Sequence, residues 1–263
     1  MEKLFIIKIG GNVVDDSDAL ESFLAAYASV PARKILIHGG GKIATRIGDK
    51  LGIESRYING RRITDAETRD LVTMVYGGLL NKQIVATLQR LRCNAVGLTG
   101  ADGNVLSAVK RPVKDIDYGY VGDIQPADVN ISLLRSLLTN GLEPVFAPLT
   151  HSGGEILNTN ADTIASVLAI ALSNAFDVRL VFCFEKKGVL EDVGDPDSVI
   201  RHLTGDRYRD LLAKGSLADG ILPKLENAFA AIREGVREVL IGHAADIVRN
   251  TGDDMEGTLI TAH

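Results

Sequence analysis

The stretch Leu4-Phe5-Ile6-Ile7-Lys8-Ile9-Gly10-Gly11-Asn12 joins a short apolar run to a pair of glycines. Consecutive apolar residues that end at a glycine turn are typical of a strand buried on both faces. An amphipathic pattern over residues 18–29 follows and predicts a helix. Strand, turn and helix in this order form the first unit of a parallel sheet covered by helices.

The same order continues along the chain. Thr64 and Glu67 have the spacing of a capping box at the start of a long helix, and Asn160 can cap a later one. Glycines and prolines between 104 and 125 predict hairpins. The chain is therefore expected to be an α/β protein with a mainly parallel sheet. Further strands are expected at 34–37, 95–98, 144–147, 178–184 and 239–241, and further helices at 65–92, 133–138 and 160–172.

Composition excludes several classes of protein. The 263 residues are 46% hydrophobic and 24% charged, which is usual for a globular chain, and the formal net charge of −5 argues against a nucleic-acid binder. Cys93 and Cys183 form no CxxC pair, so neither a zinc site nor a disulfide framework is expected. The N-terminal sequence has no signal-peptide pattern, and the apolar segment 163–176 is too short to span a membrane. We expect a cytoplasmic protein without a membrane partner.

The first glycine turn, Gly10-Gly11, follows Lys8 at the end of the first strand. Glycines let the backbone approach a ligand closely, and exposed amides can bind phosphate. A lysine at the strand end would neutralise phosphate charge. The alternative is a tight turn beside a solvated lysine.

The second glycine turn, His38-Gly39-Gly40-Gly41-Lys42-Ile43-Ala44, fits the pattern GxGxxA of dinucleotide-binding proteins. The acidic residue expected about 20 residues later is not evident, which weakens this interpretation. A Walker A loop is excluded because Lys42 is followed by isoleucine. A histidine such as His38 is more typical of a structural turn than of a catalyst.

Both turns occur together with three later segments, and in this order and spacing the chain resembles the amino acid kinase family, within it the acetylglutamate kinases. These segments are Asn59-Gly60-Arg61-Arg62-Ile63-Thr64, Leu157-Asn158-Thr159-Asn160-Ala161-Asp162 and Ala218-Asp219-Gly220-Ile221-Leu222-Pro223-Lys224. The resemblance implies a three-layer αβα sandwich. It also implies transfer of the γ-phosphoryl group of ATP to the side-chain carboxylate of an N-acylglutamate, in arginine biosynthesis.

The resemblance assigns roles to individual residues. Lys8 and Lys224 match the two cations that stabilise the transferred phosphoryl group, and Asp162 matches the residue that orients them. Arg62 matches the arginine that holds a substrate carboxylate, and Asn158 matches a second substrate contact. Without the resemblance, Arg62 would be a surface ion-pair residue and Asp162 a stabiliser of a helix start. Gly40 and Gly41 would lie beside the substrate.

ATP with Mg²⁺ is the implied cofactor, and no dedicated metal site is expected in the protein. The implied nucleotide contacts are Gly10, Gly11, Glu185, Gly188 and Asp219. Phe182-Cys183-Phe184-Glu185-Lys186-Lys187-Gly188 departs from the family, which commonly has Ser-Asp before a glycine there. Glu185 is expected to replace that aspartate, and Lys186 or Lys187 to add charge near ATP. Ala101 likewise stands where the family often has lysine.

The resemblance also implies an organisation in two lobes. Residues 1–175 would bind the acylglutamate, and residues 176–263 would bind ATP. Arginine-inhibited relatives have an extra helix before the first strand, which leads us to expect an arginine-insensitive homodimer that buries the helix at 65–92. Three alternatives stay open: a family member with another acceptor, a ligand-sensing paralogue without turnover, and an NAD-dependent dehydrogenase. The acyl group, acetyl or a larger or acidic one such as succinyl, is also open.

Overall fold

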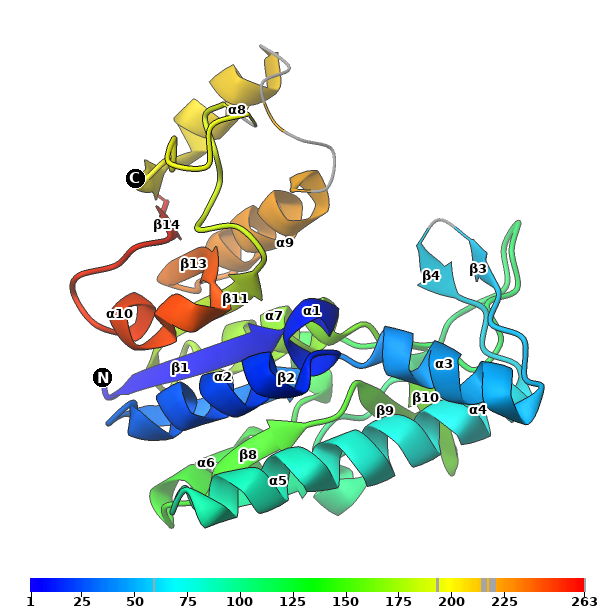
Figure 1. The fold of residues 1–263 in the computed structure, drawn as a ribbon. Coiled ribbons are helices and arrows are strands. Elements are labelled where there is room, and N and C mark those ends of the chain that lie inside the picture. Colours follow the sequence, from blue (N-terminus) through cyan, green and yellow to red (C-terminus); the bar gives the residue numbers. More distant parts are fainter. Residues whose placement is uncertain (59, 193, 214–216, 218–220, 263) are drawn as a thin grey trace.

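A computed structural model describes residues 1–58, 60–192, 194–213, 217 and 221–262. Its centre is an eight-stranded sheet (Figure 1). All paired neighbours are parallel except β13 and β14, so the expected mainly parallel α/β fold is confirmed. In sheet order the strands are β12 (His202–Leu203), β14 (Thr258–Ile260), β13 (Glu238–His243), β11 (Asp177–Phe184), β1 (Lys3–Ile9), β2 (Arg33–His38), β8 (Glu143–Phe146) and β5 (Ala95–Leu98).

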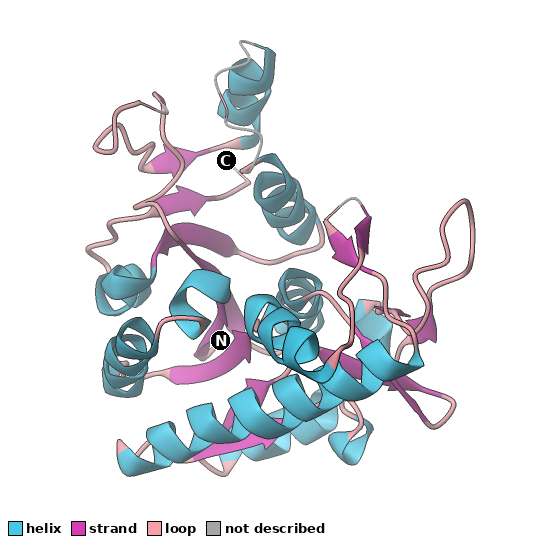
Figure 2. Cartoon of the chain, turned by 45° about the vertical axis from the view of Figure 1, so that its right-hand side comes forward, coloured by secondary structure: helices cyan, strands magenta, loops and turns pink. Residues whose placement is uncertain are grey.

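Alternating side chains of β1 enter two separate cores. Leu4 and Ile6 pack on one face of the sheet, and Phe5, Ile7 and Ile9 pack on the other, because successive side chains of a strand point to opposite faces. Helices cover both faces, so the three-layer αβα sandwich is confirmed (Figures 1 and 2). One face carries α6 (Ile131–Thr139), α7 (Ala161–Leu172) and α9 (Leu222–Arg233); the other carries α2 (Ser17–Ser29), α5 (Asn81–Arg90) and α10 (Ile247–Thr251).

The long helix expected at 65–92 runs from Ala66 to Arg90. It comprises α4 (Ala66–Val72), a π-helical segment (Thr73–Leu80) and α5. The expected capping box is wrong, because the side chain of Asp65 accepts the helix N–H of Thr68, whereas the Thr64 hydroxyl donates to the carbonyl of Arg62. That N–H bond holds the pKa of Asp65 below its usual value.

The helix from Ala66 to Arg90 is long and apolar enough to span a membrane by length and composition alone. Its apolar side chains Leu71, Val72, Tyr76, Ile84 and Leu88 are buried in the core of one sheet face. It is therefore a core helix of the sandwich.

Hairpins extend beyond the carboxyl ends of β2 and β8 (Figure 1). The hairpin expected between 104 and 125 is confirmed as β6 (Val109–Lys110) with β7 (Gly122–Asp123). Two other hairpins were not expected: β3 (Tyr57–Ile58) with β4 (Arg61–Arg62), and β9 (Leu149–Ser152) with β10 (Glu155–Asn158). β3 and β4 have two residues each, which is too short for an alternating pattern of apolar and polar residues to indicate a strand.

The expected lobe boundary near residue 175 falls between α7 and β11. The sheet continues across it, because β1 pairs with β11 from Lys3 and Asp177 to Lys8 and Phe182. The separate binding roles of the two parts stay a prediction.

Candidate active site

Two glycine turns lie side by side at the carboxyl ends of β1 and β2. Gly10 precedes the short helix α1 (Gly11–Val14), and Gly40 precedes α3 (Gly41–Leu51). A Cβ on Gly39 would lie 3.8 Å from the backbone of Gly10 and of Gly11. That distance is an ordinary van der Waals contact, so the two turns are neighbours in the structure.

Gly40 is required by its backbone conformation as well as by space. Its φ is +153°, in a region that side chains disfavour, and a Cβ there would lie 2.4 Å from Leu80 Cδ1. Lys42, two residues further on, links the two turns through its ammonium group, which lies 3.1 Å from Asn12 Oδ1 and 3.8 Å from Asp15 Oδ2.

Three charged residues from distant parts of the chain meet beside these turns. Lys8 Nζ lies 2.8 Å from Asp162 Oδ1, and Lys224 Nζ lies 3.5 Å from Asp162 Oδ2. Burial opposes ionisation of Asp162, but the two ammonium groups outweigh it and hold its pKa below the usual value. Lys8 comes from the carboxyl end of β1 and Lys224 from the start of α9. The carboxylate of Asp162, in the first turn of α7, holds both ammonium groups.

One pocket opens on each side of the glycine turns. The first, which we call the β1 pocket, has a volume of about 200 Å³. The β1 pocket is lined by Lys8, Gly10, Gly11, Asn12, Val13, Cys183, Phe184, Glu185 and Lys224. Lys224 Nζ also lies 5.5 Å from the centre of the Phe184 ring. Backbone amides and two ammonium groups in one pocket suit a polyphosphate.

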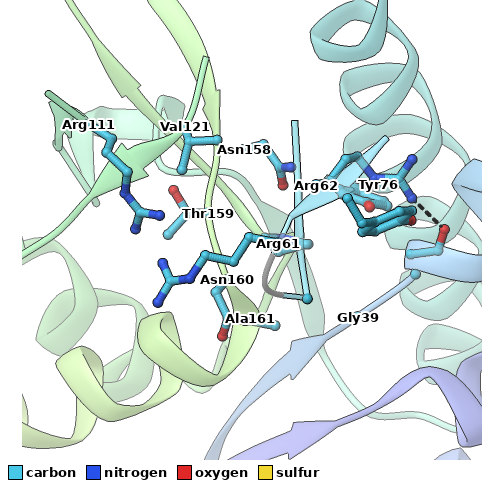
Figure 3. Close-up of a pocket in the computed structure, with 15 residues that line it drawn as sticks. Gly39, Arg61, Arg62, Tyr76, Arg111, Val121, Asn158, Thr159, Asn160 and Ala161 are labelled. Carbon is cyan, nitrogen blue, oxygen red and sulfur yellow. Dashed lines mark hydrogen bonds between the residues drawn. The ribbon is translucent and has the colours of Figure 1, made fainter. Parts of the chain in front are cut away.

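The second pocket, which we call the hairpin pocket, has a volume of about 220 Å³ and lies between the glycine turns and the hairpins (Figure 3). Gly40, Gly41 and Ala161 are among its lining residues, and Ala161 directly precedes Asp162. Gly39 of the hairpin pocket lies against Gly10 and Gly11 of the β1 pocket, so the two pockets are neighbours. We call Lys8, Asp162 and Lys224, which lie beside this boundary, the junction.

Arg62 is 6% exposed and stands at one side of the hairpin pocket. Its guanidinium donates to Ser55 Oγ (2.5 Å), the Gly41 carbonyl (2.8 Å) and Thr45 Oγ1 (2.9 Å). These bonds use three of its five donors and fix the plane of the group. Asn158 also lines this pocket, and its amide donates to Thr64 Oγ1 at 3.1 Å.

A sequence model of the amino acid kinase family matches residues 3–243, which include both glycine turns and Asp162. The chain belongs to the amino acid kinase family. The match replaces the dinucleotide interpretation of the second glycine turn.

Several relatives of this amino acid kinase cover almost its whole length. A protein of Phocaeicola vulgatus named acetylglutamate kinase is 55% identical over 95% of this chain and 97% of its own length. One of Cytophaga hutchinsonii with the same name is 54% identical over 100% of both. Among solved structures, a Streptococcus mutans protein is 28% identical with a TM-score of 0.77 over 99% of both chains. A carbamate kinase of Giardia lamblia bound to AMP-PNP, 15% identical with a TM-score of 0.71 over 100% of this chain and 99% of its own, shares the fold.

The residues expected to contact the nucleotide lie in different surroundings in this amino acid kinase. Glu185 lines the β1 pocket, and its contact with ATP stays a prediction. Gly188 is buried, and a Cβ there would lie 2.6 Å from Thr258 Oγ1, so its lack of a side chain permits close packing against β14; its contact with the nucleotide stays a prediction. Lys187 Nζ lies 2.6 Å from Asp197 Oδ1, and Asp219 lies outside the described residues.

Sequence reasoning assigned no role to two arginines of the hairpin pocket, Arg61 and Arg111. In the sequence, Arg61 stands out only as the neighbour of Arg62. Arg111 lies in the hairpin stretch, where no helical or strand periodicity points to a site. The sequence signal that could have indicated a role for Arg61 is the pair of adjacent positive charges, Arg61 and Arg62, next to Gly60.

His38 is a structural residue in this amino acid kinase, as expected. Its side chain is fully buried, Nδ1 donates to the Gly39 carbonyl at 2.7 Å, and Nε2 lies 3.3 Å from Asn81 Nδ2. The carbonyl can only accept, which places the ring proton on Nδ1. Burial lowers the pKa of His38 from 6.5 to about 4.

This burial predicts pH-dependent stability. Between pH 6.5 and about 4 the unfolded chain binds a proton at residue 38 that the folded chain does not, so stability falls as the pH is lowered through this range. We expect a loss of roughly 2 kcal/mol from pH 7 to pH 5 through this group. Urea unfolding at both pH values measures it. His38→Gln should show a shallower pH dependence, and an unchanged one would contradict the assignment.

Proposed function

We propose that this chain transfers the γ-phosphoryl group of ATP to the side-chain carboxylate of an N-acylglutamate, forming an acyl phosphate in arginine biosynthesis. The observation that carries the proposal is that Asp162, next to Ala161 of the hairpin pocket, pairs with Lys8 and Lys224 of the β1 pocket. The relatives named acetylglutamate kinase, at 52–56% identity over nearly the full length, support the same activity.

The reaction needs charge stabilisation more than proton transfer. A glutamate side chain has a pKa near 4.3, so it is ionised at neutral pH and needs no general base. Its oxygen forms a bond to the γ-phosphorus while the bond from that phosphorus to the β–γ bridging oxygen breaks, and ADP leaves with the electron pair. Positioning and positive charge then supply most of the catalysis.

The residues of the junction have distinct tasks in this proposal. Lys8 and Lys224 neutralise charge on the phosphoryl group as it passes between the two anions. Asp162 touches both ammonium groups and keeps them at that place. Gly10 and Gly11 present amides to the phosphates, and Gly40 and Gly41 admit the substrate carboxylate without steric conflict.

Mg²⁺ is expected to accompany ATP in this proposal. In such sites the ion is usually held by phosphate oxygens, water and one or two carboxylates, and it neutralises phosphate charge. Glu185 is the acidic residue among the described residues of the β1 pocket, so the residues fit this mode. Among the described residues no cluster of three His, Cys, Asp or Glu side chains could hold a metal by itself. Free, buried Cys93 and Cys183 suit a reducing cytoplasm.

Arg62 gives a prediction about substrate affinity. Arg62 lines the hairpin pocket and can bind the α-carboxylate of the substrate in place of one of its present acceptors Gly41, Thr45 and Ser55, which hold the guanidinium there. Arg62→Ala should weaken acylglutamate binding roughly 10- to 100-fold, the value of hydrogen bonds between charged groups. Arg62→Lys should restore it only in part, because an ammonium cannot make the planar contact. Isothermal titration measures this, with exposed Arg135→Ala on α6 as control; equal affinities in wild type and Arg62→Ala would refute the role.

We also propose that the chain forms a homodimer through the helix from Ala66 to Arg90 and is insensitive to arginine. Met74 and Leu79 on this helix are 57% and 42% exposed, and a second copy would cover them. Light scattering should give twice the monomer mass, and activity should persist at millimolar arginine. A monomer or hexamer, or strong inhibition, would disprove this prediction.

A further inference from the structure

The hairpin pocket holds more positive charge than an acetylated substrate uses. Arg61, Arg62 and Arg111 line it, and none of its described lining residues is acidic. N-acetylglutamate has two carboxylates. In the proposed function the side-chain carboxylate reacts beside Lys8, and the α-carboxylate binds Arg62, which leaves Arg61 and Arg111 without a partner in the substrate.

Arg61 and Arg62 are neighbours on β4 and point in different directions, as successive residues of a strand do. Arg62 lies beside Tyr76, whereas the guanidinium of Arg61 crosses the hairpin pocket toward Asn160 (Figure 3). Arg61 is exposed, and no ion pair or hydrogen bond of its side chain occurs within the described part of the chain. Its charge is therefore available to a ligand.

Arg111 directly follows β6, and its guanidinium points into the same side of the pocket near Thr159 (Figure 3). Asp123 of β7 accepts from its Nε at 3.0 Å and from Nη2 at 2.5 Å, which holds the group in place. Arg61, Arg111 and Asp123 together carry a net charge of +1 on this side of the pocket. One further carboxylate would neutralise it.

We infer that Arg61 and Arg111 bind a carboxylate at the far end of the acyl group, so that the preferred substrate is an N-acylglutamate whose acyl group is a dicarboxylic acid. This inference rests on the proposed function and names its substrate class. A nucleotide phosphate is a poorer candidate for this charge, since neither arginine lines the β1 pocket. The pocket's arginines thus occupy two places, one for each carboxylate that does not react.

The test compares N-succinyl-L-glutamate with N-butyryl-L-glutamate, which has the same chain length without the terminal carboxylate, and with N-acetyl-L-glutamate. We expect wild-type kcat/KM to be roughly 10- to 100-fold higher for the succinyl than for the butyryl compound, the range for hydrogen bonds between charged groups. Arg61→Gln should abolish most of that preference. Arg135→Gln, an exposed arginine on α6 away from both pockets, should keep it.

Three results separate the possibilities. Equal kcat/KM for the succinyl and butyryl compounds in the wild type would overturn the inference, and this comparison does not depend on the folding of any variant. Equal losses for all three compounds in Arg61→Gln would also overturn it, because Arg61 would then bind a group common to all of them. If no compound is phosphorylated, the proposed function fails, and calorimetric binding of the succinyl and butyryl compounds still decides the inference.

Discussion

Lys8→Ala should lower kcat for phosphorylation of an N-acylglutamate by on the order of 10² to 10³, the usual cost of removing one preorganised charge from a transition state. Lys8 is 8% exposed and lies 2.8 Å from Asp162, so its ammonium is held in place before the substrates arrive. Michaelis constants should change less, because the charge on the transferred group is greatest during transfer. Steady-state kinetics with ADP detection measures both.

The matching change Lys224→Ala should have a similar effect. The double variant should lose less than the product of the two single losses, because the residues act on one phosphoryl group. Lys50→Ala is the control, since this lysine is exposed at the end of α3. Near-normal kcat in Lys8→Ala would show that the transferred group does not pass this ammonium.

Asp162→Asn should destabilise the ligand-free enzyme by about 3 kcal/mol, because removing one partner of a buried ion pair leaves the other charges uncompensated. The two ammonium groups of Lys8 and Lys224 would then face each other without the carboxylate between them. ATP should narrow the difference from wild type, since its phosphate oxygens supply the missing negative charge. Urea unfolding with and without ATP measures both effects.

Asp206→Asn is a matched control. Asp206 also stands in the first turn of a helix, α8 (Gly205–Ala213), and pairs with Arg209, but the pair is exposed to solvent. Exposed pairs contribute less than about 1 kcal/mol. If Asp162→Asn were as stable as Asp206→Asn, the role of Asp162 at the junction would be wrong. The same holds if ATP left the difference in stability between Asp162→Asn and wild type unchanged.

Local sequence determined where the site would be built. The apolar run before Gly10 forms β1, because a strand buried on both faces has apolar residues at successive positions. After β2, Gly40 adopts a backbone conformation that other residues disfavour. Asn160 caps α7 through bonds to the next helix amides, as its position indicates. These features depend only on residues that are neighbours in the sequence, so they can be predicted from the sequence.

The pairing of Lys8, Asp162 and Lys224 was expected from family resemblance and not from the spacing of the residues. Only the sheet order brings them together, since β1 lies between β2 and β11 while α7 and α9 pack on the same face. Likewise, only the tertiary structure shows that Gly188 packs so closely against Thr258 that a side chain would not fit. The directions of Arg61 and Arg111 depend on hairpins too short to leave a pattern. Local propensity acts over a few residues, whereas these contacts join residues far apart in the chain, so the tertiary structure alone decided them.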